Sequence, residues 1–130
     1  MSPGRHRVLL VEDDAGIREG ISELLAFEGY EVDRAANGAE ALDRLRDGAR
    51  PGLIVLDLVM PVMNGAQLLS RLRGEPGLAD IPVVLMTASL PSGPRLPPAS
   101  GYLSKPFELS ELLGLVERHC GAPGLAISGI

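Results

Sequence analysis

The chain has 130 residues, of which 45% are hydrophobic, and carries a net charge of −5, so it suits one domain with a buried core. The negative charge repels nucleic-acid phosphates and the sequence has no DNA-reading motif, so direct nucleic-acid binding is not expected. One cysteine excludes an intrachain disulfide and fits a reducing compartment. The first apolar run is too short for a signal peptide or a membrane span, which predicts a cytoplasmic protein without membrane insertion.

The first part of the chain predicts two strand–helix units. Residues 8–11 form a solid apolar run, which is typical of a parallel strand buried on both faces. After Asp14, apolar residues at helical spacing predict an amphipathic helix that ends near Gly29. Residues 30–35 alternate more and favour an edge strand, and Asn37 can cap a second helix behind it.

The rest of the chain continues the alternation. Apolar runs predict strands at 53–58 and 81–86, with a helix between them that begins after Asn64. A short strand at 101–104 and an amphipathic helix over 108–119 complete the order. Strands that alternate with helices imply right-handed crossovers, so we expect an α/β fold with a parallel sheet and helices on both faces.

One crossover departs from this pattern. Residues 88–100 contain four prolines, which lack an amide hydrogen and clash with the preceding helical turn. We therefore predict an irregular or partly extended segment with at most one helical turn, in which Leu90 and Leu96 dock on the sheet. Residues 121–130 are expected to be a flexible tail.

Polar side chains gather where the predicted strands end. Ligands of parallel α/β sheets bind outside these carboxyl ends. The polar residues there are Glu12, Asp13, Asp14, Asp57, Thr87 and Lys105. Clustered carboxylates repel one another unless a cation is bound, and oxygen ligands with room for water favour Mg²⁺. A carboxylate can attack phosphorus, and the phosphoryl oxygens then need cations and hydrogen-bond donors, so the pattern predicts Mg²⁺-dependent phosphoryl transfer.

Lys105 is the only lysine among the twelve lysine and arginine residues. Because the two side chains are not equivalent at a phosphate site, this predicts a phosphate-binding role for its compact ammonium group. To point back over the sheet edge while the chain turns into the last helix, Lys105 is predicted to precede Pro106 through a cis peptide bond.

Four strings at the predicted strand ends, VEDD, LIVLDLVMPVMNG, VVLMTA and GYLSKPF, resemble the receiver domains of two-component response regulators, including the chemotaxis regulator. The resemblance implies a single receiver domain over residues 1–130, with its core at about 6–120. It also implies a doubly wound, flavodoxin-like five-stranded parallel sheet of order 2-1-3-4-5. The helix between strands four and five is then replaced by the Pro-rich segment.

The resemblance also implies a role for each site residue. Asp57 resembles the phosphoacceptor, assisted by Lys105 and Thr87, and Tyr102 resembles the aromatic residue that reports the state of the Thr87 switch. The implied Mg²⁺ ligands are Glu12 through water, Asp13, Asp57 and the backbone carbonyl of Val59. Asp14 is interpreted as a helix cap because an acid suits a helix N-terminus. Ala88 leaves the approach to phosphorus open, and Pro61 and Gly65 shape the loop after Asp57.

The function implied is that of a phosphoacceptor signalling domain rather than an enzyme, limited to self-phosphorylation and slow autodephosphorylation. Its expected partners are a histidine kinase or histidine phosphotransfer protein, a downstream protein, and a second copy of the chain. The Pro-rich crossover favours an alternative, a receiver-fold interaction module with atypical or phosphorylation-independent signalling. A haloacid-dehalogenase-type phosphatase is disfavoured because Val59 stands where it needs a second acid.

Overall fold

The computed structural model describes residues 6–48, 50–58, 63–88 and 98–121. Within these ranges the chain forms a five-stranded parallel sheet in the order β2-β1-β3-β4-β5, which confirms the predicted topology. The strands are β1 (Arg7–Val11), β2 (Glu31–Ala35), β3 (Leu53–Asp57), β4 (Val83–Thr87) and β5 (Gly101–Ser104).

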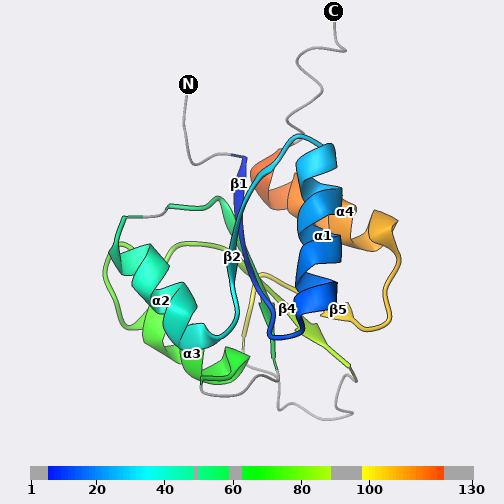
Figure 1. Ribbon diagram of the computed structural model, residues 1–130. Coiled ribbons are helices and arrows are strands. Elements are labelled where there is room, and N and C mark those ends of the chain that lie inside the picture. Colours follow the sequence, from blue (N-terminus) through cyan, green and yellow to red (C-terminus); the bar gives the residue numbers. More distant parts are fainter. Residues whose placement is uncertain (1–5, 49, 59–62, 89–97, 122–130) are drawn as a thin grey trace, which may run out of the picture.

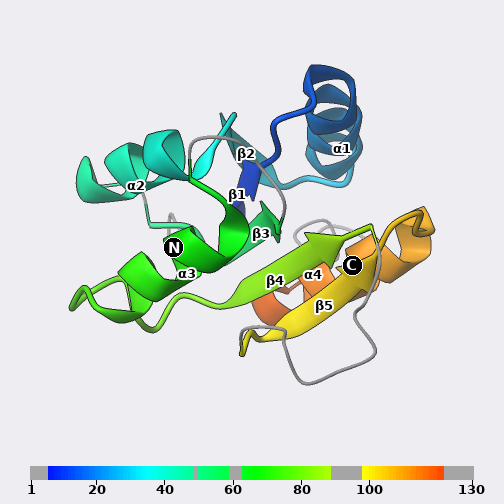
Figure 2. The same cartoon turned by 90° about the horizontal axis from the view of Figure 1, so that it is seen from below.

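Helices cover both faces of the sheet. They are α1 (Ala15–Phe27), α2 (Gly38–Arg46), α3 (Gly65–Arg73) and α4 (Leu109–Cys120). Figures 1 and 2 show α2 and α3 on one face and α1 and α4 on the other. Each face has its own apolar core, because successive side chains of a strand point to opposite sides of the sheet. Leu9 and Val11 of β1 therefore pack towards α2 and α3, whereas Val8 and Leu10 pack towards α1 and α4.

The helix boundaries follow from local side-chain chemistry. Asp14, Asn37 and Asn64 each accept a hydrogen bond from a backbone amide of the first turn of the helix that follows. After α1 and α2 the chain turns at Gly29 and Gly48, where φ is 100° and 112°, a region that favours glycine. These caps fix where each helix enters and leaves the sheet edge.

Most predicted element positions are confirmed to within two residues. The fourth strand begins at Val83 rather than at residue 81, because Pro82 has no amide hydrogen for the ladder. The peptide bond between Lys105 and Pro106 is cis, as predicted. Residues 89–97 and 122–130 lie outside the described ranges, so the conformation of the Pro-rich crossover, the docking of Leu90 and Leu96, and the flexible tail stay predictions. None of the described helices is long and apolar enough to cross a membrane.

Candidate phosphoryl-transfer site at the carboxyl edge of the sheet

A buried ion-pair cluster lies at the carboxyl ends of β1, β3 and β5. The Lys105 Nζ atom donates hydrogen bonds to Glu12 Oε1 at 2.9 Å and to Asp57 Oδ2 at 3.1 Å. Glu12 follows β1 and Asp57 ends β3, its neighbour in the sheet, whereas Lys105 follows the edge strand β5. The ammonium group therefore reaches back over β4 to join two acids that the fold has already placed side by side.

The environment of this cluster shifts the pKa values of Glu12 and Lys105. Only 1% of Glu12 and 6% of Asp57 is exposed. Burial raises the pKa of Glu12 to about 7, although the hydrogen bond from Lys105 opposes the change. Burial lowers the pKa of Lys105, but its hydrogen bonds to Glu12 and Asp57 and their negative charges together outweigh burial, so this pKa lies above its ordinary value. Lys105 is thus held as a cation between the two acids.

Asp13 adds a third carboxylate to the cluster. One carboxylate oxygen from each of Glu12, Asp13 and Asp57 lies within 4.8 Å of the other two. Asp13 is exposed, so this side of the cluster is open to solvent, whereas its other two acids are buried. Three hard oxygen donors with space for water on one side fit a divalent cation such as Mg²⁺. Val59, whose carbonyl was predicted as a further ligand, lies outside the described residues.

The turn between β1 and α1 holds the acids through several backbone bonds. The Glu12 amide donates to the Ala35 carbonyl at 3.0 Å, and the Asp14 amide donates to Glu12 Oε2 at 3.2 Å. Asp14 itself accepts a hydrogen bond from the Ile17 amide at 2.9 Å, which confirms its predicted place as the cap of α1. The Asp14 carboxylate is therefore engaged by the helix, and the three acids of the cluster are Glu12, Asp13 and Asp57.

Thr87 and Tyr102 lie on the neighbouring strands β4 and β5. Thr87 is buried at the end of β4, next in the chain to Met86, which is the register partner of Asp57. Its carbonyl accepts the Lys105 amide at 2.7 Å, which ties the start of the loop after β5 to β4. Tyr102 is 38% exposed, and its hydroxyl accepts a hydrogen bond from the Ala99 amide at 3.0 Å.

Gly65 lets α3 begin directly against the end of β3. A Cβ atom on Gly65 would lie 2.6 Å from the Asp57 carbonyl oxygen and 2.8 Å from the Leu58 Cα atom. The Gly65 amide also donates to the Leu58 carbonyl at 3.0 Å. This close approach is the physical reason for glycine at a position predicted to shape the loop, whereas Pro61 lies outside the described residues.

The sequence matches the family model described as the response regulator receiver domain over residues 8–117. The chain belongs to the response regulator receiver domain family. This receiver domain is 40% identical over 111 residues to the response regulator MprA of Mycobacterium tuberculosis, which covers 82% of the chain and 47% of MprA. The chain thus spans about half the length of the curated relatives it matches.

Solved receiver structures agree with this assignment. The chemotaxis protein CheY4 of Vibrio cholerae is 34% identical, with a TM-score of 0.77 over 86% of this chain and 96% of that one. The receiver domain of the sensor histidine kinase PA1611 from Pseudomonas aeruginosa is 29% identical, with a TM-score of 0.80 over 89% and 98%. The latter structure has a magnesium ion coordinated in its active site cleft.

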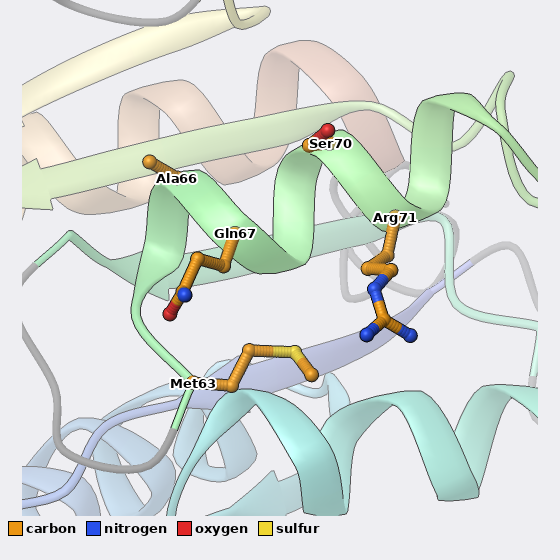
Figure 3. A pocket seen from close by; sticks show the side chains of 5 residues that line it. All are labelled: Met63, Ala66, Gln67, Ser70 and Arg71. Atoms are coloured by element: carbon orange, nitrogen blue, oxygen red, sulfur yellow. The ribbon is translucent and has the colours of Figure 1, made fainter.

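The receiver domain also has features that its sequence did not reveal. The Arg18 guanidinium donates to the Glu12 carbonyl at 2.8 Å, a contact to backbone that leaves no residue pattern. A separate pocket of about 510 Å³ is lined by Met63, Ala66, Gln67, Ser70 and Arg71. Figure 3 shows that Met63, Gln67 and Arg71 lie between α3 and α2, whereas Ala66 and Ser70 lie on the other side of α3. None of the predicted site residues lines this pocket.

Proposed function

We propose that this receiver domain accepts a phosphoryl group on Asp57 in a Mg²⁺-dependent reaction, and that phosphorylation changes its interactions with partner proteins. The donor is the phosphohistidine of a histidine kinase or a histidine phosphotransfer protein. The observation that carries the proposal is the buried Asp57 carboxylate, which contacts the Lys105 ammonium and lies within 4.8 Å of the Glu12 and Asp13 carboxylate oxygens.

The acidic residues supply the metal site in this proposal. Asp13 and Asp57 would hold Mg²⁺ directly, Glu12 would hold it through water, and the Val59 carbonyl would be the further ligand that the family resemblance implies. When bound, the cation neutralises the clustered carboxylates and the charge on the phosphoryl oxygens. Metal binding requires Glu12 to be ionised, so the raised pKa of Glu12 couples metal binding to proton release.

The chemical step is a substitution at phosphorus. A carboxylate oxygen of Asp57 forms the new O–P bond while the N–P bond to the donor imidazole breaks and the nitrogen keeps its electron pair. Lys105 releases its hydrogen bond to Asp57 Oδ2 and donates to a phosphoryl oxygen instead. The Thr87 hydroxyl, at the end of β4, donates to another phosphoryl oxygen. The product is the acyl phosphate of Asp57.

Signal output follows from the same residues. Thr87 and Tyr102 sit on adjacent strands, so a change at the Thr87 hydroxyl reaches the exposed edge strand of the sheet. The domain acts as a signalling module, with self-phosphorylation and slow autodephosphorylation as its only reactions. A downstream protein or a second copy of the chain recognises the altered surface, and the setting is the cytoplasm.

The phosphoryl donor approaches beside Lys105. A recess of about 520 Å³ is lined there by Ile17, Ala88, Lys105, Pro106 and Phe107. Apart from the lysine its lining is apolar, and Ile17 is an exposed large hydrophobic residue on α1. An apolar rim next to a charged reaction centre suits a helical protein partner that presents a phosphohistidine.

Labelling with a small acyl phosphate tests the proposal. The wild-type domain should gain one acid-stable, base-labile phosphoryl group when Mg²⁺ is present and none when it is chelated. Asp57→Asn should gain none, because an amide is not a competent nucleophile, and Asp13→Asn should react more slowly at limiting Mg²⁺. Asp80→Asn, which removes an exposed acid outside the cluster, is the matched control. Labelling of Asp57→Asn at the wild-type rate would refute the assignment.

A further inference from the structure

Arg18 reaches from α1 back to the turn that carries the two adjacent acids Glu12 and Asp13. Arg18 is the fourth residue of α1, and its side chain is half-buried. Its Nη1 atom donates to the Glu12 carbonyl at 2.8 Å and lies 3.5 Å from the Asp13 carbonyl, the outer limit of a hydrogen bond. One guanidinium group therefore contacts the backbone of both acids while leaving their carboxylates to the cluster.

Helix stability does not account for a cation at this position. The N-terminus of an α-helix carries partial positive charge, so an arginine near it is electrostatically unfavourable. The first turn of α1 contains no acidic residue, and the N-cap Asp14 already accepts the Ile17 amide. The contact with the Glu12 and Asp13 carbonyls thus accounts for the placement of Arg18 better than the helix does.

The turn itself has a reason to be held. Carboxylate oxygens of Glu12, Asp13 and Asp57 lie within 4.8 Å of one another, and their repulsion is strongest when no metal ion is bound. The Glu12 amide is fixed by Ala35, and its carboxylate accepts the Asp14 amide. Arg18 fixes the remaining backbone group of Glu12, its carbonyl. With this contact, the Glu12 backbone is anchored by hydrogen bonds on both sides of its Cα atom.

We infer that Arg18 is a positioning residue that holds the Glu12–Asp13 backbone in the metal-binding arrangement before the cation arrives. The inference rests on the proposed function, because it assigns the purpose of that arrangement. Preorganised ligands bind a cation more tightly since less order has to be imposed on binding.

The sign of the effect separates positioning from simple charge. If Arg18 acted only as a nearby positive charge, it would repel Mg²⁺, and its removal would tighten metal binding. If it holds the turn, its removal loosens the ligands and weakens metal binding. Arg18→Met removes the charge and the donors but keeps an unbranched stem, whereas Arg18→Lys keeps the charge and one donor group.

The experiment measures Mg²⁺ affinity by isothermal titration of the full chain, together with the rate of labelling by an acyl phosphate across a range of Mg²⁺ concentrations. Arg18→Met should bind Mg²⁺ about tenfold more weakly. Its labelling rate at saturating Mg²⁺ should stay close to that of the wild type, because Asp57, Lys105 and Thr87 are untouched. Arg18→Lys should recover a large part of the affinity. Arg44→Met, an exposed arginine of α2, should match the wild type.

The two hypotheses are separated when the wild type is labelled and Asp57→Asn is not. Unchanged or tighter Mg²⁺ binding in Arg18→Met would then overturn this inference and leave the proposed function standing. Hydrogen exchange of the Asp14 amide in metal-free protein gives a second readout. Faster exchange in Arg18→Met than in Arg44→Met is expected, and equal exchange would also overturn the inference. This measurement decides the role of Arg18 even if the wild type takes no phosphoryl group. Urea unfolding establishes that each variant is folded.

Discussion

Glu12→Gln should make the metal-free domain more stable, and the gain should depend on pH. Burial raises the pKa of Glu12 from its ordinary value of 4.5 to about 7. The folded state therefore binds a proton that the unfolded state releases between these two values, and stability falls as pH rises through this window. A tenfold change in proton affinity corresponds to ~1.4 kcal/mol, so ionised Glu12 costs the fold about 3 kcal/mol above pH 7.

Glutamine removes this cost while its amide oxygen can still accept the hydrogen bond from Lys105. The free energy of unfolding is measured by urea denaturation in chelator at about pH 5 and about pH 8. The advantage of Glu12→Gln over the wild type should grow by about 2 to 3 kcal/mol between the two conditions. Glu19→Gln on the exposed side of α1 makes the same change in net charge and should show no such growth.

Added Mg²⁺ provides the second arm of this test. At the higher pH it should stabilise the wild type more than Glu12→Gln, because the ionised Glu12 carboxylate would then bind a water molecule on the cation. An advantage of equal size at both pH values would refute the reasoning, since it would mean that Glu12 ionises in the fold as it does in the unfolded chain.

Three further outcomes follow from single residues. In urea unfolding, Gly20→Ala should raise the free energy of unfolding by ~0.5–1 kcal/mol because its Cβ meets open space. Gly65→Ala should lower it by ~1–3 kcal/mol because its Cβ meets backbone, and a neutral Gly65→Ala would contradict the packing. Burial raises the pKa of Cys120 to about 11, so a thiol reagent near neutral pH should label it slowly until urea is added, and fast native labelling would count against its burial. Burial raises the pKa of Tyr30 to about 12, so the stability of the wild type relative to Tyr30→Phe should fall as pH rises from about 10 towards 12, and a constant difference would argue against a buried phenol.

The sheet could be predicted because its strands have distinct compositions. The inner strands β1, β3 and β4 are rich in Val, Ile and Leu, and the structure buries nearly all of their residues. The edge strand β2 alternates and is mostly exposed or half-buried. Periodicity could not fix the order of strands within the sheet, because each apolar strand can pair with any other. The family resemblance supplied that order.

The candidate site was predictable only in part. The convergence of Glu12, Asp57 and Lys105 follows from the rule that parallel strands end at one edge. The direct bond between Lys105 and Glu12 does not follow, because it depends on how far the ammonium reaches across β4. The contact of Arg18 with backbone carbonyls leaves no signal in residue types. Tyr30, predicted within a strand, lies just before β2 and donates its hydroxyl to the Gly121 carbonyl at 2.7 Å, a long-range bond that local patterns cannot contain.

The central claim is that Asp57 is the phosphoacceptor, and chemical mapping of the acyl phosphate tests it most directly. Borohydride reduces an aspartyl phosphate to homoserine, which peptide mass spectrometry can assign to one position. After phosphorylation in Mg²⁺, homoserine should appear at position 57 and at no other acidic residue, and chelation of the metal should abolish it. Homoserine at position 13, or none at position 57 in protein that carries acid-stable, base-labile phosphate, would contradict the account.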